Sequence, residues 1–224
     1  LLRVSSPIEF GQLFLGRVVG EFMRCYPAIQ VEVELTTRTI DPVEEGIDVV
    51  IHRGRLQDSS LVARPMMTSP RQLFASPDYI AQYGMPKNPE ELAQHRCINT
   101  LMDGGRKWHF DEPNVSVQVT PVLTANNITF AREVAIAGAG IINVPAFIAE
   151  PYVEQGLLCR VLEHVVLPST ELYALYPSRR FQAMKVKAFI DFMIDSLEKY
   201  LSAEVEAGAE PLVLSPAEQD DLQP

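Results

Sequence analysis

Residues 40–61 read IDPVEEGIDVVIHRGRLQDSSL and contain the clearest strand signal in the chain. The apolar run from Ile47 to Ile51 is interrupted only by Asp48, and its length suits a buried β-strand better than a helix. Open α/β sheets bind ligands at the carboxyl ends of their strands, and the residues His52-Arg53-Gly54 follow this strand directly. Arg53 is therefore a candidate anion-binding side chain. The alternative, which the sequence leaves equally open, is a structural ion pair of Arg53 with Asp48 or Asp58.

The composition is that of an ordinary globular protein. The chain has 224 residues, of which 47% are hydrophobic and 21% are charged. This length fits one large domain or two small ones, with a sizeable core. No run of 18 apolar residues occurs, so the sequence predicts no membrane span. The first residues, LLRVSSPIEFGQ, lack the basic and apolar regions of a signal peptide, and they are interpreted as the start of an excised fragment.

The negative charge is concentrated at one end of the chain. The net charge is −10, but six acidic residues and no basic ones follow Leu201, which leaves −4 for the first 200 residues. Binding to nucleic acid phosphates needs a basic surface. This chain is therefore not expected to bind DNA by itself. Residues 202–224 are rich in Glu, Asp, Ala and Pro and are expected to be a disordered acidic tail.

The reactive residue types are scattered. The three cysteines lie far apart, without a CxxC spacing, and are expected to be reduced thiols of a cytoplasmic protein. The four histidines show no metal-ligand spacing, so no metal and no cofactor are expected. The sequence has no GxSxG, no phosphate-binding P-loop and no GxGxxG after a strand. No catalytic set is predicted, and the protein is not expected to be an enzyme.

Strand-like and helix-like segments alternate along the chain. A helix over residues 10–26 has an apolar arc of roughly 180°, wider than one core face requires. Short helices are predicted from Asp41–Pro42, Ser76, Asn88, Asn126–Asn127 and Pro145, and a last helix over residues 181–201. The predicted strands are residues 1–5, 29–35, 47–51, two pieces within 61–75, 97–101, 107–110, 115–122, 141–144, 157–162 and 171–176.

These segments together resemble the effector-binding domain of LysR-type transcriptional regulators. The resemblance starts in the family pattern "vDlv..giDvaiR.G...dssL", which matches Asp41, Val43, Gly46, Ile47, Asp48, Val49, Ile51, Arg53, Gly54, Asp58, Ser59, Ser60 and Leu61. It extends to about Tyr200 through the opening LLRVSSPIEFGQLFLGRVVGEFMRCYPAIQVEVEL, the segment SPDY, residues 88–97 and the segment AGAGIINVP. Each motif alone is weak, but their order and spacing agree with the family.

The resemblance implies a type II periplasmic-binding-protein fold of class α/β. Two α/β subdomains would be joined by two crossover strands, with a cleft between them. Subdomain I would comprise residues 1–68 and 169–201, and subdomain II residues 69–168. The crossovers would act as hinges.

Polar side chains at predicted strand ends are the candidate effector-binding residues. Serines after the first strand precede a helix N-terminus, which suits a carboxylate, although they could simply cap that helix. Threonines and Arg38 follow the second strand. In subdomain II, two polar residues end a strand and two asparagines begin a helix, where N-capping is the alternative. The full candidate set is Ser5, Ser6, Thr36, Thr37, Arg53, Asn99, Thr100, Asn126 and Asn127.

The resemblance also implies the function. A small polar or anionic metabolite would bind in the cleft and shift the populations of two arrangements. DNA would be bound only by an N-terminal winged helix-turn-helix domain that this chain lacks. A cytoplasmic homodimer is expected, which could extend to a tetramer in the full-length protein, with the helix over residues 10–26 packed on the partner's helix after Asn127. A periplasmic solute-binding protein is the alternative, and an enzyme on the same fold is a third class.

Overall fold

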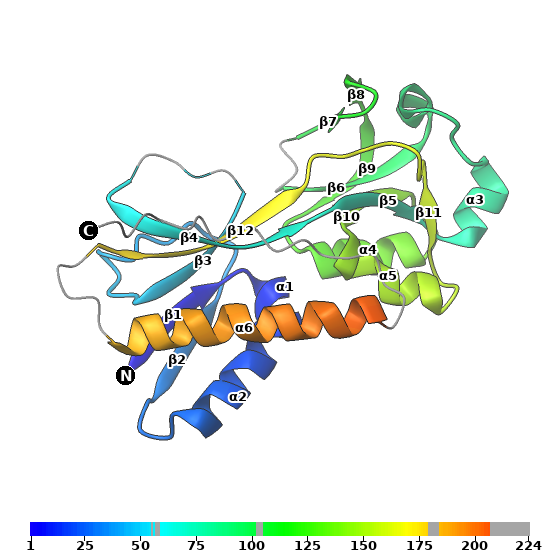
Figure 1. Ribbon diagram of the computed structural model, residues 1–224. Helices are drawn as coiled ribbons and strands as arrows, with labels where there is room; N and C mark the ends of the chain where they lie inside the picture. The colour runs from blue at the N-terminus through cyan, green and yellow to red at the C-terminus, as the bar shows by residue number, and fades with distance from the viewer. Residues whose placement is uncertain (55, 57–58, 102–104, 179–183, 207–224) are drawn as a thin grey trace, which may run out of the picture. The chain divides into compact units, whose positions relative to one another are not determined.

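The computed structural model describes residues 1–54, 56, 59–101, 105–178 and 184–206 (Figure 1). The chain divides into two compact units. Unit 1 comprises Leu1–Thr68 and the chain from Glu171 onward, and unit 2 comprises Ser69–Thr170. Each unit has its own sheet and is described by itself.

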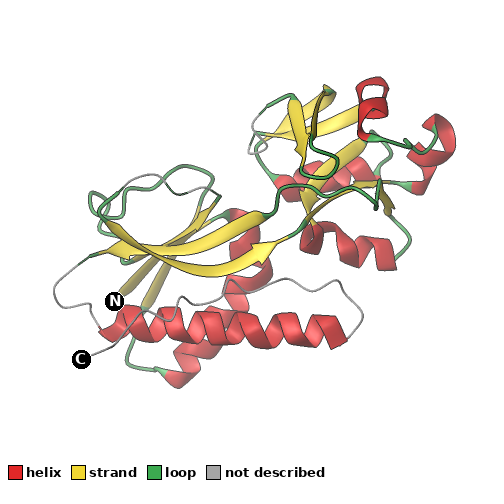
Figure 2. Ribbon diagram, turned by 45° about the horizontal axis from the view of Figure 1, so that its top comes forward, coloured by secondary structure: helices red, strands yellow, loops and turns green. Residues whose placement is uncertain are grey.

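Unit 1 is built on a five-stranded sheet with the order β2-β1-β3-β12-β4. β1 (Leu2–Ser6) runs parallel to both β2 (Val31–Leu35) and β3 (Val49–Arg53). β12 (Thr170–Pro177) runs antiparallel to β3, and the long strand β4 (Leu61–Ser69) lies beside β12 (Figure 2). The carboxyl ends of β1, β2 and β3 therefore share one edge of the sheet.

One continuous helix follows β1 and packs against the last helix of the chain. It consists of α1 (Ile8–Phe10), a π-helical turn η1 (Gly11–Leu15) and α2 (Gly16–Cys25). Its partner, α6 (Met184–Glu206), is the long orange helix of Figure 1. Phe22 meets the rings of Phe189 and Phe192 edge-on, with centroids 5.1 and 5.6 Å away. Such pairs stabilise a contact beyond the area that they bury.

Unit 2 has a five-stranded sheet with the order β11-β5-β10-β6-β9. β6 (Arg96–Thr100), β9 (Thr120–Ala125) and β10 (Ile141–Pro145) are parallel, whereas β5 (Arg71–Ala75) is antiparallel to both β10 and β11 (Cys159–Val161). The strands β7 (Lys107–Phe110) and β8 (Val115–Gln118) form a separate hairpin. The helical segments are α3 (Pro77–Tyr83), the 3-10 helix η2 (Pro89–Gln94), α4 (Ile128–Ile136) and α5 (Ala146–Glu154).

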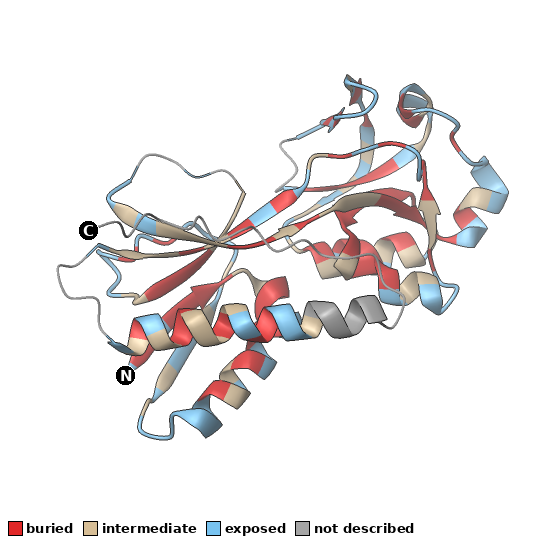
Figure 3. Cartoon of the chain, viewed as in Figure 1, coloured by how far each residue is buried: buried red, intermediate tan, exposed pale blue. Residues whose placement is uncertain are grey.

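The sheet of unit 2 has a hydrophobic core on each face (Figure 3). Successive residues of a strand point to opposite faces. Accordingly Phe74 packs with Ile128 and Ile148 of the helices α4 and α5, while its neighbour Leu73 packs with Tyr79 and Trp108. A sheet that is covered on both faces can present ligand groups only at its edges and strand ends.

Several segments differ from the sequence-based expectation. Residues 42–46 form a single turn rather than a helix: the Asp41 carboxylate accepts the N–H groups of Val43 and Glu44 as an N-cap does, but Gly46 adopts a φ of +66° and ends the turn. The single strand expected over residues 115–122 is wrong, because the chain changes partner at Val119: β8 pairs with β7 and β9 with β6. The strand expected at residues 47–51 lies at Val49–Arg53.

The last helix is longer than expected at its carboxyl end. It was expected to end at residue 201, but α6 runs on to Glu206. Residues 202–206 of the expected disordered tail are therefore helical. The rest of that tail, residues 207–224, lies outside the described residues.

Candidate functional site

The serines after β1 lie at the shared carboxyl edge of the unit 1 sheet. Ser5 and Ser6 are each only 1% exposed. The Ser6 hydroxyl donates to the carbonyl of Pro7 at 3.1 Å, but the buried Ser5 hydroxyl has no hydrogen-bond partner among the described residues. A buried hydroxyl without a partner is costly and calls for an explanation.

Neither serine caps the helix that follows. Pro7 occupies the N-cap position of α1 and no side chain accepts a hydrogen bond there. The capping alternative for Ser5 and Ser6 is therefore wrong. The helix contains a π-helical turn one turn after its start, closed by the bond from the Gly16 N–H to the Gly11 carbonyl. Such turns occur frequently at functional sites.

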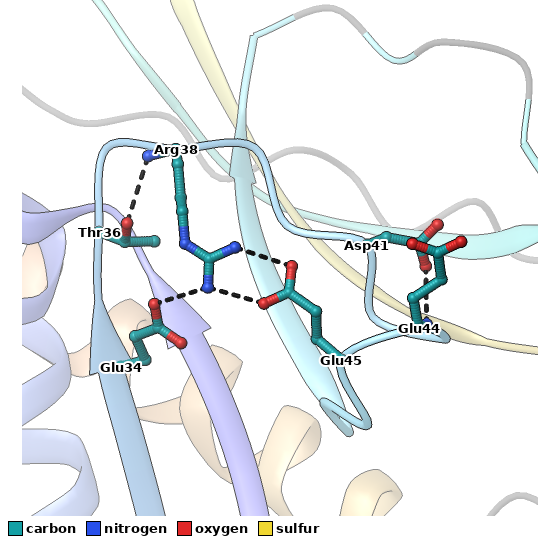
Figure 4. A network of polar contacts seen from close by, with 6 residues as sticks. All are labelled: Glu34, Thr36, Arg38, Asp41, Glu44 and Glu45. Atoms are coloured by element: carbon teal, nitrogen blue, oxygen red, sulfur yellow. Dashed lines mark hydrogen bonds and ion pairs between the residues drawn. The ribbon is translucent and has the colours of Figure 1, made fainter.

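Thr36 and Arg38 belong to a polar network that is complete within unit 1 (Figure 4). The Arg38 guanidinium donates to both oxygens of Glu45, at 2.9 and 2.7 Å, and to Glu34 at 3.0 Å. These bonds, those to Glu45 first, raise the pKa of Arg38 above its ordinary value. Its backbone N–H donates to the Thr36 hydroxyl at 3.3 Å. Arg38 thus links the end of β2 to the turn at residues 42–46, which is a structural role rather than an anion-binding one. Thr37 is exposed beside it.

Arg53 is half-buried at the end of β3, where its backbone pairs with Leu172. Asp48, one of its two candidate partners, binds elsewhere: its carboxylate accepts from Lys185 at 2.6 Å and from the Arg3 N–H at 2.9 Å. Four residues of extended chain, Val49 to His52, lie between Asp48 and Arg53, which places their side chains well apart. The other candidate, Asp58, lies outside the described residues. A ligand-binding role for Arg53 stays a prediction.

In unit 2, the candidates at the strand ends differ in burial and in the contacts that they make. Asn99 is 3% exposed, and its amide oxygen accepts from the indole N–H of Trp108 at 3.3 Å. Asn127 caps α4, since its side-chain oxygen accepts from the Phe130 N–H and from the Thr129 hydroxyl, both at 2.7 Å. Of the two roles considered for Asn127, ligand binding and helix capping, the structure therefore shows capping. Thr100 is buried at the end of β6, and Asn126 is exposed at the end of β9.

Sequence reasoning missed Arg71 and Asn143. The Arg71 guanidinium donates to the Asn143 side-chain oxygen at 3.0 Å and to the Asn143 carbonyl at 2.8 Å. The signal was present, because Asn143 interrupts the apolar run IINVP of a strand that is buried throughout. A polar residue in such a strand needs a partner.

Two general properties complete the description of the site. Among the described residues, no group of three His, Cys, Asp or Glu side chains could hold a metal ion. In the same part of the chain, no helix combines the length and the apolarity that crossing a bilayer requires.

The chain has two sheet-based α/β units with polar groups at strand carboxyl ends, which is the edge where open α/β sheets bind ligands. Comparison with known proteins makes this specific. The family model of the LysR substrate binding domain matches residues 1–198, and the chain belongs to this family. The expected type II periplasmic-binding-protein-like α/β fold is thereby confirmed.

The relatives are transcriptional regulators. An HTH-type transcriptional regulator of Xanthomonas campestris is 31% identical over 203 residues, which cover 88% of this chain and 59% of that protein. PtxR, an HTH-type transcriptional regulator of Pseudomonas aeruginosa, is 31% identical over 206 residues, which cover 91% of this chain and 65% of that protein. The chain thus spans about 60–65% of the length of these relatives.

A solved structure agrees with the sequence comparison. CrgA, a LysR-type transcriptional regulator from Neisseria meningitidis, superimposes with a TM-score of 0.78 at 27% identity, over 88% of this chain and 68% of that one. The family consists of regulators and not of enzymes, as expected. A solute-binding protein is not favoured, because the relatives carry a helix-turn-helix designation.

Proposed function

We propose that this chain is the effector-sensing part of a cytoplasmic transcriptional regulator. A small polar molecule binds at the strand ends, and its binding energy shifts the balance between two arrangements of the protein. A separate DNA-binding domain of the longer protein carries the contacts to DNA, in keeping with the helix-turn-helix designation of the relatives. The inter-unit cleft expected from the sequence stays part of this proposal.

The observation that supports it most directly is the Ser5 hydroxyl. It lies buried without a partner at the carboxyl end of a parallel strand, just before a helix N-terminus. A ligand polar group that reaches this hydroxyl would remove the cost of leaving it unsatisfied. Ser6, Arg53, Thr100 and Asn126 are the other candidate contacts, because each ends or follows a parallel strand.

Substitution of Ser5 tests the proposal with two opposed readouts. Ser5→Ala removes an unsatisfied polar group, so the unliganded protein should melt at the same or a higher temperature. The same variant should lose most of the thermal shift that a metabolite panel produces in the wild type. Ser116→Ala, an exposed serine of the β7-β8 hairpin, serves as the control. A panel without any shift, or an unliganded Ser5→Ala protein of clearly lower stability, would contradict the proposal.

We also propose a homodimer. Leu13 and Met23 are 45% and 46% exposed on the continuous helix of unit 1, and Phe130 is 56% exposed on α4. Burying these side chains against a second copy would satisfy the wide apolar arc of the helix. Sedimentation at tens of micromolar should show a dimer, and Leu13→Lys with Phe130→Lys should give monomers. A wild-type monomer at that concentration would exclude a tight dimer.

A further inference from the structure

A face of mixed apolar and basic character is exposed on the continuous helix of unit 1. It is called the helix face and consists of Leu13, Arg17, Gly20, Met23 and Arg24. All five are exposed, and their spacings of three and four residues place them on one side of the helix. Leu13 and Met23 are large apolar side chains that are 45% and 46% exposed. Covering them would remove apolar surface from water, which favours binding of a partner.

The two arginines of the helix face are less well compensated than other arginines of unit 1. Arg38 holds two carboxylates and Arg64 holds one. In contrast, Arg17 lies 3.5 Å from the carboxylate of Glu21, and 69% of its side chain is exposed. Arg24 forms no ion pair with any residue that the structure describes. Exposed pairs contribute little, so the helix face keeps positive charge for an acidic partner.

The carboxyl end of α6 lies beside this face. α2 and α6 run antiparallel (Figure 1), as the contacts at their two ends show. At one end the rings of Tyr26 and Phe192 meet with centroids 6.4 Å apart, and at the other the Arg17 guanidinium lies 4.3 Å from the centroid of the Tyr200 ring. A cation over an aromatic ring is attracted to it. The chain therefore leaves unit 1 next to an arginine of the helix face.

The sequence that follows α6 carries groups complementary to the helix face. After Glu206 there is no basic residue, and the acidic residues are Glu210, Glu218, Asp220 and Asp221. The stretch PLVLSP at positions 211–216 adds three large apolar side chains. Opposite charge and apolar side chains are thus present in the same segment, as they are on the helix face.

Residues 207–224, called the acidic segment, are long enough to reach the whole helix face. At 1.5 Å per residue, α6 extends about 9 Å beyond Tyr200, and Arg17 and Arg24 are about 10 Å apart along α2. An extended chain covers about 3.3 Å per residue, so roughly six residues span the return to Arg24. The segment has 18 residues. A short tether also gives an effective concentration on the order of millimolar, at which weak contacts suffice.

We propose that the acidic segment binds the helix face of its own chain and competes there with a second copy of the protein. Its carboxylates pair with Arg17 and Arg24, and its apolar stretch covers Leu13 and Met23. The competition rests on the proposed homodimer, which buries the same two apolar side chains, whereas the contact within one chain does not depend on it. The segment acts as an autoinhibitory strap that weakens dimerisation.

The methyl NMR signal of Met23 tests the contact on the full chain. The background is Phe130→Lys, which removes the α4 side of the proposed dimer and leaves the helix face intact. Changing the three last acidic residues, by Glu218→Gln, Asp220→Asn and Asp221→Asn, should shift the Met23 signal. A chain that ends after Glu206 should show the same shift. The signal of Met67, which is 0% exposed, should stay in place.

Substitutions on the helix side test the same contact from its other partner. Arg24→Gln should shift the Met23 signal in the direction that loss of the acidic segment does. Arg24→Lys keeps the charge and should leave most of the contact in place. Arg3→Gln is the matched control, because Arg3 is a second arginine of unit 1 with an exposed side chain (47%) whose partner is Glu32. It should not shift the Met23 signal.

Sedimentation of the chain without Phe130→Lys measures the competition. Neutralising the three acidic residues should lower the dissociation constant of the dimer about threefold to tenfold, the worth of a few exposed ion pairs. A lower net charge alone also reduces repulsion between copies. The control therefore neutralises three exposed residues of unit 2, by Glu90→Gln, Glu154→Gln and Glu163→Gln, and should stay within about twofold of wild type. High salt should remove most of the difference, since it screens exposed pairs.

The outcomes separate this inference from the proposed homodimer. A Met23 signal that moves neither with the acidic segment nor with Arg24→Gln overturns the inference. A shift that disappears on dilution also overturns it, because the segment would then bind another copy. A concentration-independent shift in a protein that never dimerises supports the contact and excludes the homodimer. A dimer whose dissociation constant ignores the acidic residues supports the homodimer and overturns the competition.

Discussion

The Asp48 carboxylate accepts a hydrogen bond from Lys185 Nζ at 2.6 Å, and thereby ties the segment before β3 to the first turn of α6. The same oxygen accepts the Arg3 N–H at 2.9 Å. Asp48 is the acidic residue that interrupts the apolar run at Ile47–Ile51. Its role is therefore structural: it holds together parts of unit 1 that lie 137 positions apart in the sequence.

Removing this carboxylate should destabilise the protein. Asp48→Ala should lower the free energy of unfolding by about 1–3 kcal/mol, since hydrogen bonds to charged groups are at the strong end of the range. Urea unfolding measures the change. Glu32→Ala is the control, because its ion pair with Arg3 is exposed (47% and 62%) and should contribute less than about 1 kcal/mol. Equal losses in the two variants would show that Asp48 is an ordinary surface charge.

The cap of α4 gives a second prediction. Asn127→Ala removes the acceptor for the Phe130 N–H and should cost about 1 kcal/mol of stability. Asn127→Asp keeps an acceptor and adds a favourable charge at the helix N-terminus, so it should be neutral or stabilising. Affinity for a metabolite that stabilises the wild type, measured well below the melting temperature, should stay within about twofold of wild type in Asn127→Ala. A larger loss of affinity would indicate that Asn127 contacts the ligand in addition to capping α4.

A feature of the fold or of the candidate site could be predicted from the sequence when it depends only on residues that are close together in the chain. The cap by Asn127, the α3 start at Ser76–Pro77 and the strand Ile141–Pro145 could be predicted, because each depends on a few neighbouring residues. The unsatisfied hydroxyl of Ser5 could not, since burial without a partner is decided by the whole unit. Arg71 was missed for a topological reason: only the antiparallel placement of β5 brings it to the carboxyl end of β10.

Two glycines offer a matched pair of substitutions. A Cβ at Gly140 would lie 2.4 Å from the backbone oxygen of Arg96, which cannot move without disturbing β6. Gly140→Ala should therefore cost at least about 1–3 kcal/mol. At Gly20 of α2, nothing lies within 4 Å of the added Cβ, so Gly20→Ala should stabilise the helix by about 0.5–1 kcal/mol. Thermal unfolding of both variants checks the opposite signs, and a stable Gly140→Ala protein would be unexpected.

The cysteines should differ sharply in reactivity. Burial raises the pKa of the Cys97 thiol to about 12. It also raises the pKa of Cys159, aided by the charge of Glu163. Because the thiolate is the reactive form, Cys97 should be alkylated about a thousandfold more slowly than a thiol of ordinary pKa. Cys25 is exposed. Mass spectrometry after iodoacetamide at pH 7.5 should show one fast thiol, and Cys25→Ser should abolish it; a second fast thiol would contradict the burial argument.

Stability should fall in mildly acidic solution because of His95. The Tyr79 hydroxyl lies 3.1 Å from His95 Nδ1 and accepts the Arg96 N–H at 2.9 Å. A neutral imidazole with its proton on Nε2 can accept the Tyr79 hydroxyl proton at Nδ1, whereas a protonated imidazole cannot. Desolvation lowers the pKa of His95 in the folded protein, and the nearby charge of Glu91 opposes this. The folded state thus disfavours the protonated imidazole relative to the unfolded state.

The sign of the pH dependence follows from that direction. The stability contributed by neutral His95 is fully present above its ordinary pKa of 6.5 and is lost as the pH falls through 6.5 towards the lower folded value. Carboxylates with lowered pKa, such as Glu21 and Glu45, add losses only below about 4.5. Urea unfolding at pH 7.5 and 5.5 should therefore show a larger decrease for wild type than for His95→Asn. His164→Asn, an exposed control, should behave as wild type; equal decreases in wild type and His95→Asn would rule out His95 as the cause.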